Sequence, residues 1–244
     1  MSTEDPEEIA KFERMASEWW DPDGKFKPLH RINPLRTEYI RQQLRPAGGG
    51  LEGLEMLDIG CGGGILSESL DGLGGRVTAI DRSATIIGVA QAHQKESGSQ
   101  VVYRVQSVAE LARERPESFD VVLAMEVLEH VPDVPTFLME CATLLKPGGT
   151  FFFATLNKTL QAWLMAIVGA EYVLRWLPKG THEFDKFIRP SDLGRWLRHT
   201  GVEMRDVTGM RYIPWRDSWE LAVGKAEVNY LGHGVRTGEL PASE

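Results

Sequence analysis

The sequence predicts a doubly wound α/β fold, in which helices cover both faces of an open, mostly parallel β-sheet. Five short apolar runs alternate with segments long enough to form helices, a pattern typical of right-handed βαβ units. A glycine-rich turn follows the first run, at the end of the strand where such sheets bind ligands. The chain has 244 residues, 42% of them hydrophobic and 25% charged, which is enough for one such domain with a large core.

Two helices are expected before the first strand, in a helical cap formed by residues 1–50. Apolar residues recur at helical spacing near the N-terminus, at Ile9, Phe12, Ala16 and Trp19. Turn-forming residues at 20–24 end this pattern. A second helix is expected to begin after Asn33, with Pro34 at its first position, and to run to about Leu44. Both helices would then lie across the top of the domain.

A seven-stranded sheet is expected after this cap. Five parallel strands are predicted at 56–59, 77–80, 101–105, 121–124 and 150–155, and runs at 203–207 and 219–223 are expected to complete the sheet. A further helix is expected to open at Pro190. We therefore expect a single domain that consists of the cap, a cofactor-binding half at 51–155, an apolar helical insertion at 156–190 and a C-terminal substrate half at 191–244.

The net charge and the cysteine content limit the classes of partner and the cellular compartment that we expect. The formal net charge is −8, which disfavours nucleic acid as a partner because an acidic surface repels phosphates. The two cysteines, Cys61 and Cys141, are too few for a disulfide framework and favour a reducing compartment. The N-terminal residues lack the basic region and apolar run of a secretory signal, and no long uncharged apolar stretch predicts a membrane span. A cytoplasmic protein is expected.

The glycine-rich turn and the acid after it predict a nucleotide-type cofactor site. Gly60 and Gly62 follow the first strand, where glycine allows the backbone to turn tightly and approach a ligand. Asp81 ends the second strand, 21 residues after Gly60, and its carboxylate can accept both hydroxyls of a ribose, from NAD or S-adenosylmethionine alike. An NAD fingerprint wants Gly or Ala where this chain has Ile65. This chain also lacks a recognisable Tyr-x-x-x-Lys pair. An NAD-dependent oxidoreductase is therefore disfavoured.

The end of the fourth strand predicts the rest of the site. Met125 should lie under the cofactor, and residues 106–108 after the third strand are placed to meet an adenine. Glu126, Glu129 and His130 are three and four residues apart, so they share one face of a helical turn. They could hold Mg²⁺ or another divalent ion. Alternatively they are solvated, or His130 acts alone as a base.

The glycine loop, the strand-end acid and the fourth strand together resemble the class I S-adenosylmethionine-dependent methyltransferases, over about residues 54–155. Segments within and on either side of this region indicate one family of this class. Residues 19–21, 26–36, 125–131, 155–158 and 177–182 stand in the order found in the ubiquinone biosynthesis O-methyltransferase family. The similarity runs from about residue 7 to residue 232, nearly the whole chain.

This resemblance implies an O-methyltransferase that moves a methyl group from S-adenosylmethionine to a ring hydroxyl of polyprenylated catechols or phenols, in both O-methylation steps of ubiquinone synthesis. It implies that Arg36, Gly60, Asp81 and Met125 contact the cofactor, with Gly62 in the same loop. Because a phenol near pKa 10 needs help to ionise at neutral pH, we hypothesise metal-assisted deprotonation by Glu126, Glu129 and His130, with Glu126 and His130 as the catalytic pair. Alternatives are a methyltransferase of another small molecule and a non-catalytic subunit of a quinone-synthesis assembly.

The apolar stretch at 160–177 gains a role if the substrate is a polyprenyl lipid. Its only charged residues are Glu171 and Arg175, and a helix so apolar should be buried or should meet lipid or a partner. Its aromatic residues suit a helix lying in the membrane interface. We therefore expect peripheral contact with the inner face of the cell membrane, with a buried cap or dimer helix as the alternative.

Overall fold

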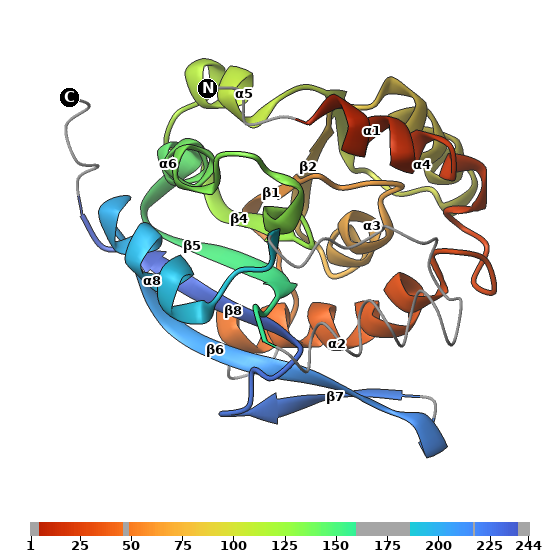
Figure 1. The fold of residues 1–244 in the computed structure, drawn as a ribbon. Coiled ribbons are helices and arrows are strands. Elements are labelled where there is room, and N and C mark those ends of the chain that lie inside the picture. The colour runs from red at the N-terminus through yellow and green to blue at the C-terminus, as the bar shows by residue number, and fades with distance from the viewer. Residues whose placement is uncertain (1–4, 46–48, 160–185, 217, 239–244) are drawn as a thin grey trace.

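The computed structural model describes residues 5–45, 49–159, 186–216 and 218–238. Its centre is an eight-stranded sheet in the order β3-β2-β1-β4-β5-β8-β6-β7 (Figure 1). The strands are β1 (Glu55–Ile59), β2 (Arg76–Asp81), β3 (Val102–Val105), β4 (Phe119–Met125), β5 (Leu145–Leu156), β6 (Val202–Ile213), β7 (Ser218–Val223) and β8 (Asn229–Arg236). The first five are parallel, whereas β8 runs antiparallel between β5 and β6, and β7 pairs antiparallel with β6. The predicted doubly wound, mostly parallel fold is confirmed.

Two layers of helices cover the sheet. Helices α5 (Val108–Glu114), α6 (Val134–Leu144) and α8 (Pro190–His199) pack on one face, and α2 (Lys27–Leu44), α3 (Ile65–Asp71) and α4 (Ala84–Ser97) on the other. Successive strand residues alternate between the two cores, so that Leu57 belongs to the first and Met56 to the second. The strands are buried on both faces, as expected for a parallel sheet between helices.

The two predicted last strands are present, because 203–207 lies in β6 and 219–223 in β7, but the sheet has eight strands instead of the expected seven. The run at 219–223 lies in the edge strand β7, and the strand beside β5 is β8, which was not predicted. Glycines at 232 and 234 break its apolar pattern, and glycine weakens the strand signal. The close packing of β8 explains them, because a Cβ at Gly232 would lie 2.3 Å from the carbonyl oxygen of Asp206 and 2.7 Å from the ring of Phe153.

The N-terminal helices also differ from the expectation. Helix α1 (Pro6–Glu13) ends early, and a separate 3₁₀ turn η1 (Ala16–Glu18) leads to Trp19. Helix α2 begins at Lys27, so that Pro34 lies inside it rather than at its start. Burial of Ile32, Tyr39 and Ile40 from α2 in the sheet core outweighs the cost of an internal proline. Helix α2 therefore covers one face of the sheet instead of lying across its top.

No helix in the described ranges is both long and apolar enough to cross a bilayer. The predicted interfacial helix at 160–177, and with it most of the predicted insertion at 156–190, lies outside the described residues.

Candidate active site

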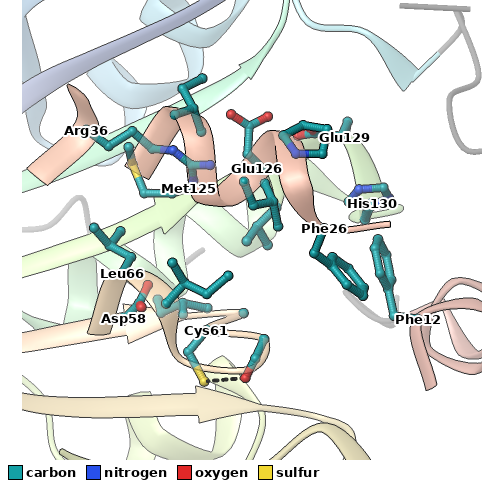
Figure 2. A pocket seen from close by; sticks show the side chains of 18 of the residues that line it. Phe12, Phe26, Arg36, Asp58, Cys61, Leu66, Met125, Glu126, Glu129 and His130 are labelled. Carbon is teal, nitrogen blue, oxygen red and sulfur yellow. Dashed lines mark hydrogen bonds between the residues drawn. The ribbon is translucent and has the colours of Figure 1, made fainter. Parts of the chain in front are cut away.

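A large cavity of about 820 Å³ lies at the carboxyl ends of the parallel strands (Figure 2). The site residues predicted from the sequence all line it: Arg36, Gly60, Gly62, Asp81, Met125, Glu126, Glu129 and His130. They come from α2, the loop after β1, the end of β2, and the end of β4 with the 3₁₀ turn η2 (Leu128–His130) that follows it. The topology thus gathers at one sheet edge residues that are far apart in the sequence.

The glycine loop is shaped by left-handed backbone and by close neighbours. Gly60 and Gly62 have φ values of 66° and 56°, a region that L side chains rarely adopt. A Cβ at Gly60 would lie 2.6 Å from Cγ2 of Val127, and one at Gly62 would lie 2.1 Å from the ring of Trp19. The loop therefore requires glycine at both positions, and the Trp19 ring of the N-terminal segment packs directly on it.

Asp81 is fixed to this loop by hydrogen bonds. Its carboxylate accepts from the backbone N–H of Gly62 at 3.1 Å and from that of Ser83 at 3.0 Å. Burial raises the pKa of Asp81, and these backbone donors oppose the rise. Loop and acid thus form one hydrogen-bonded unit facing the cavity, as the spacing in the sequence predicts.

Arg36 is a buried cation without a partner for one of its nitrogens. Its side chain is 5% exposed, and Nε has no hydrogen bond. Burial lowers the pKa of Arg36, while the negative charges of Glu126, Asp58 and Glu129 favour its charged form. A buried guanidinium that lines a cavity and lacks a hydrogen bond is prepared for an anionic ligand.

Asp58 is a buried acid that the sequence analysis passed over. It lies in β1, accepts a hydrogen bond from the Ser67 hydroxyl at 2.6 Å, and lines the cavity. Burial raises its pKa to about 6. The available signal was an acid inside an otherwise apolar strand, since buried acids are rare without a partner or a function.

Glu126 and Glu129 form a buried carboxyl pair. Glu126 has a left-handed backbone, with φ of 59°, a strained conformation that often marks functional sites. Burial, followed by the negative charge of Glu129, raises the pKa of Glu126 to about 7, against the opposing charge of Arg36. Glu129 is 5% exposed and accepts a hydrogen bond from the Thr155 hydroxyl at 2.7 Å. Glu126 therefore keeps its proton up to a pH close to neutrality.

The pKa of Glu126 predicts a pH-dependent stability. Between the ordinary value of 4.5 and the folded value of about 7, the unfolded chain has lost this proton and the folded chain keeps it. Stability should therefore fall as the pH rises through this window and level off above it. We expect Glu126→Gln to gain in melting temperature over the wild type as the pH rises from 4.5 to 7. Calorimetric melting at several pH values measures this, and a pH-independent difference would contradict it.

His130 contacts the N-terminal helix. Its Nδ1 lies 2.9 Å from Oε2 of Glu8 on α1, and its ring meets the Phe12 ring edge-on, with centroids 5.2 Å apart. The hydrogen bond to His130 lowers the pKa of Glu8 to about 2. With a proton on Nδ1 donated to Glu8, Nε2 is the acceptor nitrogen of a neutral imidazole. No sequence signal points to Glu8, which is 122 residues away from His130.

The segment predicted to meet an adenine also lines the cavity. Gln106, Ser107 and Val108 are all among its lining residues. The side-chain amide of Gln106, however, donates to Glu114 at 2.8 Å, and Ser107 caps α5 in a capping box with Glu110. The contribution of this segment to an adenine site would therefore come from backbone and from Val108.

Comparison with known proteins shows the family to which the chain belongs. A family model described as a methyltransferase domain matches residues 57–153. A curated ubiquinone biosynthesis O-methyltransferase from Xanthomonas axonopodis pv. citri is 52% identical over 229 residues, which cover 94% of this chain and 93% of that protein. The protein of the same name from Xylella fastidiosa strain M23 is 48% identical over 97% of this chain and 94% of its own length.

The chain belongs to the ubiquinone biosynthesis O-methyltransferase family. Among solved structures, magnesium protoporphyrin IX methyltransferase from Synechocystis PCC 6803 with bound SAH superposes with a TM-score of 0.67 at 21% identity, over 93% of this chain and 94% of that one. At this identity the likeness shows the fold alone. The predictions of the class I methyltransferase fold and of this family are confirmed. The disfavoured alternative, an NAD-dependent oxidoreductase, is wrong.

For a member of this family, the three predicted metal ligands are only partly assembled. Glu126 and Glu129 lie close enough together for the charge of Glu129 to raise the pKa of Glu126, and carboxylate oxygens suit Mg²⁺. His130, in contrast, is bonded through Nδ1 to Glu8. Within the described part of the chain, no three or more His, Cys, Asp or Glu side chains are arranged to hold a metal ion. The metal site stays a prediction, and no chemical step is derived from it below.

The contact between the glycine loop and Trp19 gives a second prediction for this family member. Gly53 and Gly62 both have positive φ, but a Cβ at Gly53 would meet nothing within 4 Å. Gly53→Ala should therefore show the backbone cost alone, a fall in Tm of about 2–8 °C. Gly62→Ala should lower Tm further and weaken S-adenosylmethionine binding, because Trp19 must move. Equal Tm values and unchanged binding, measured by calorimetry, would contradict the contact.

Proposed function

We propose that the protein transfers a methyl group from S-adenosylmethionine to a ring hydroxyl of polyprenylated catechols or phenols, in both O-methylation steps of ubiquinone synthesis. The observation that carries the proposal is one cavity that joins two different sites. One is the glycine loop with Asp81 and the unpaired guanidinium of Arg36. The other is the group formed by the buried Glu129 and the half-buried Glu126 and His130. The family relationship supports the same reading.

The residues of the cavity fit S-adenosylmethionine, which supplies an electrophilic methyl group on a sulfonium. Arg36 offers two parallel N–H donors for the carboxylate of its methionine part. Asp81, held by backbone N–H groups, accepts hydrogen bonds from ribose hydroxyls. Gly60 and Gly62, which have no side chain, let the backbone approach the cofactor in the space between Arg36 and Asp81. These roles were predicted from the sequence and the family resemblance.

Methyl transfer to a phenol requires alignment and a proton acceptor. We assign the acceptor role to Nε2 of His130, because Glu8 holds Nδ1 and thereby orients the ring. Glu126, with its pKa near neutrality, would bind a hydroxyl of the same ring as donor or acceptor. Closure of α1 and Trp19 over the cavity would exclude water. S-adenosylmethionine held by Arg36, Asp81 and the glycine loop would supply the methyl group to the phenolate oxygen.

The proposed function is tested by incubating the purified protein with labelled S-adenosylmethionine and short-chain catechol analogues, and locating the methylated atom by NMR. We expect an O-methyl product. Cofactor binding in a calorimeter without turnover would favour the non-catalytic subunit, and methylation of a carbon or nitrogen atom would favour another small-molecule methyltransferase.

A divalent ion at Glu126, Glu129 and His130 is a finer part of this proposal. It rests on the residue types and the carboxyl pair. If the ion is required, dialysis against EDTA abolishes turnover, added Mg²⁺ restores it, and Glu129→Ala is inactive in both conditions. Turnover that survives complete chelation, with an active Glu129→Ala variant, would remove the metal.

Membrane contact through residues 160–177 is likewise part of the proposal and rests on the composition of that segment alone. The inner face of the cell membrane would then be the working location. We expect the protein to float with liposomes of anionic lipid and the variant Trp163→Glu/Trp176→Glu to remain in the soluble fraction. Wild-type protein that also stays soluble would show that this contact is absent.

A further inference from the structure

The cavity extends well beyond the residues that suit the cofactor. Apart from Arg36 of α2, those residues lie on or directly after β1, β2, β3 and β4, which form one half of the sheet. The remaining strand positions that line the cavity belong to β5, β8, β6 and β7, the other half of the sheet. We call this part the outer lobe and define it by Leu156, Met210, Tyr212, Trp219, Ala222 and Asn229.

The walls of the outer lobe are largely aliphatic and aromatic. Met210 and Tyr212 are two residues apart on β6, so they point to the same face of the sheet. Tyr212 pairs with Trp219 across the β6–β7 hairpin, and the two ring centroids are 5.5 Å apart. Leu29 and Ile32 of α2 line the same cavity, and α2 contacts β7, the strand drawn beside it in Figure 1. The hairpin and the helix thus enclose an apolar space.

Charged residues take little part in these walls. Arg211, Lys225 and Glu227 also line the cavity, but Arg211 is ion-paired with Glu220 on the neighbouring strand. Lys225 and Glu227 belong to the connection between β7 and β8. A polar substrate alone would leave the aromatic walls in contact with water, which is unfavourable.

Asn229 adds a polar group to this apolar lobe. It is 8% exposed, and its Oδ1 atom has no hydrogen-bond partner. Asn229 pairs with Leu156 on β5 and with Met210 on β6, and β5 in turn pairs with β4, at whose end the carboxyl pair lies. A buried acceptor without a donor is unfavourable, and a ligand hydroxyl would supply the missing donor.

We propose that the outer lobe binds the isoprenoid tail of the acceptor where the tail joins the ring, and that Asn229 hydrogen-bonds a ring hydroxyl at its inner end. The inference rests on the proposed function and extends it to a subsite. Two features select this occupant: the lobe is continuous with the cofactor cavity, and it offers apolar walls with one unsatisfied polar group. An aromatic ring with an apolar substituent has that same distribution of polarity.

The test compares two catechols that differ only in a tail of two isoprene units. Trp219→Ala enlarges the lobe, and Trp215→Ala is the matched control, because Trp215 lies in the same hairpin but is 80% exposed and does not line the cavity. We expect Trp219→Ala to lower kcat/KM about tenfold or more for the tailed catechol, through KM. The tail-less catechol should be unaffected, and Trp215→Ala should change neither value. Equal effects of Trp219→Ala on both catechols, or no effect, would overturn the inference.

Two further variants keep the test decisive if Trp219→Ala does not fold. Met210→Trp adds bulk inside the lobe and should also lower the ratio of tailed to tail-less activity. Asn229→Leu should reduce turnover of both catechols alike, and unchanged turnover would remove Asn229 from the subsite. Wild-type turnover of the tail-less catechol tests the proposed function separately, so that a wrong subsite and a wrong reaction give different results.

Discussion

Arg36→Met is expected to weaken S-adenosylmethionine binding by about 10²–10⁴-fold, the largest effect of any change in the cofactor site. The guanidinium is buried and lacks a partner at Nε, so the ligand carboxylate would be its main hydrogen-bond acceptor. Two charge-assisted hydrogen bonds of about 1.5–3 kcal/mol each account for this loss. Isothermal titration calorimetry measures it directly.

The same variant should remain folded. Methionine is similar in length and apolar, and Asp58 and Glu126, whose pKa values are raised to about 6 and about 7, can each take up a proton when the neighbouring cation is lost. We therefore expect the melting temperature without cofactor to be unchanged or higher, while stabilisation by added S-adenosylmethionine is lost. Arg36→Lys, which keeps the charge but not the forked donors, should be intermediate in affinity. Full affinity in Arg36→Met would remove Arg36 from the cofactor site.

His130→Ala is expected to lower kcat by about 10²–10⁴-fold, the usual contribution of a general base. The ring lines the cavity and is oriented by Glu8 at 2.9 Å, whereas the cofactor cradle is formed by other residues. Binding of S-adenosylmethionine should therefore change little. Single-turnover measurements with a catechol, together with calorimetric cofactor binding, separate these two effects.

Glu8→Gln is the matched control for this prediction. Glutamine can keep a hydrogen bond to Nδ1 but removes the negative charge that orients and stabilises the imidazolium. We expect a smaller loss of kcat than in His130→Ala. A fall in cofactor affinity equal to the fall in kcat would show instead that His130 only holds the N-terminal helix in place. Unchanged kcat in His130→Ala would assign the proton acceptor role to another group.

The parts of the site that lie close together in sequence could be predicted. Gly60, Gly62 and Asp81 belong to one strand–helix–strand unit, and their spacing alone places the acid beside the loop. Glu126 and Glu129 are three residues apart and were expected on one helical turn, but only Glu129 lies on the 3₁₀ turn η2, and Glu126 precedes it with φ of 59°. Even here, the left-handed backbone of Glu126 and its raised pKa depend on burial that no local pattern reports.

The errors lie where long-range packing competes with local preference. Pro34 is typical of a helix start, yet α2 begins seven residues earlier because Ile32 and its neighbours are buried against the sheet. The glycines of β8 obscure a strand whose existence depends on the close approach of β6 and Phe153. Local propensity is a small energy, and tertiary burial overrides it.

By itself, the sequence determined the α/β alternation, the glycine loop with its acid and the family. Each of these is recognised from short segments of residues that are neighbours along the chain. Only the tertiary structure decided that Glu8 contacts His130, that Trp19 covers Gly62, and that Asn229 lines the same cavity as the carboxyl pair. These contacts link segments separated by dozens of residues, and their free energy comes from burial against the assembled sheet. No local pattern carries that information, since the sheet exists only after the chain has folded.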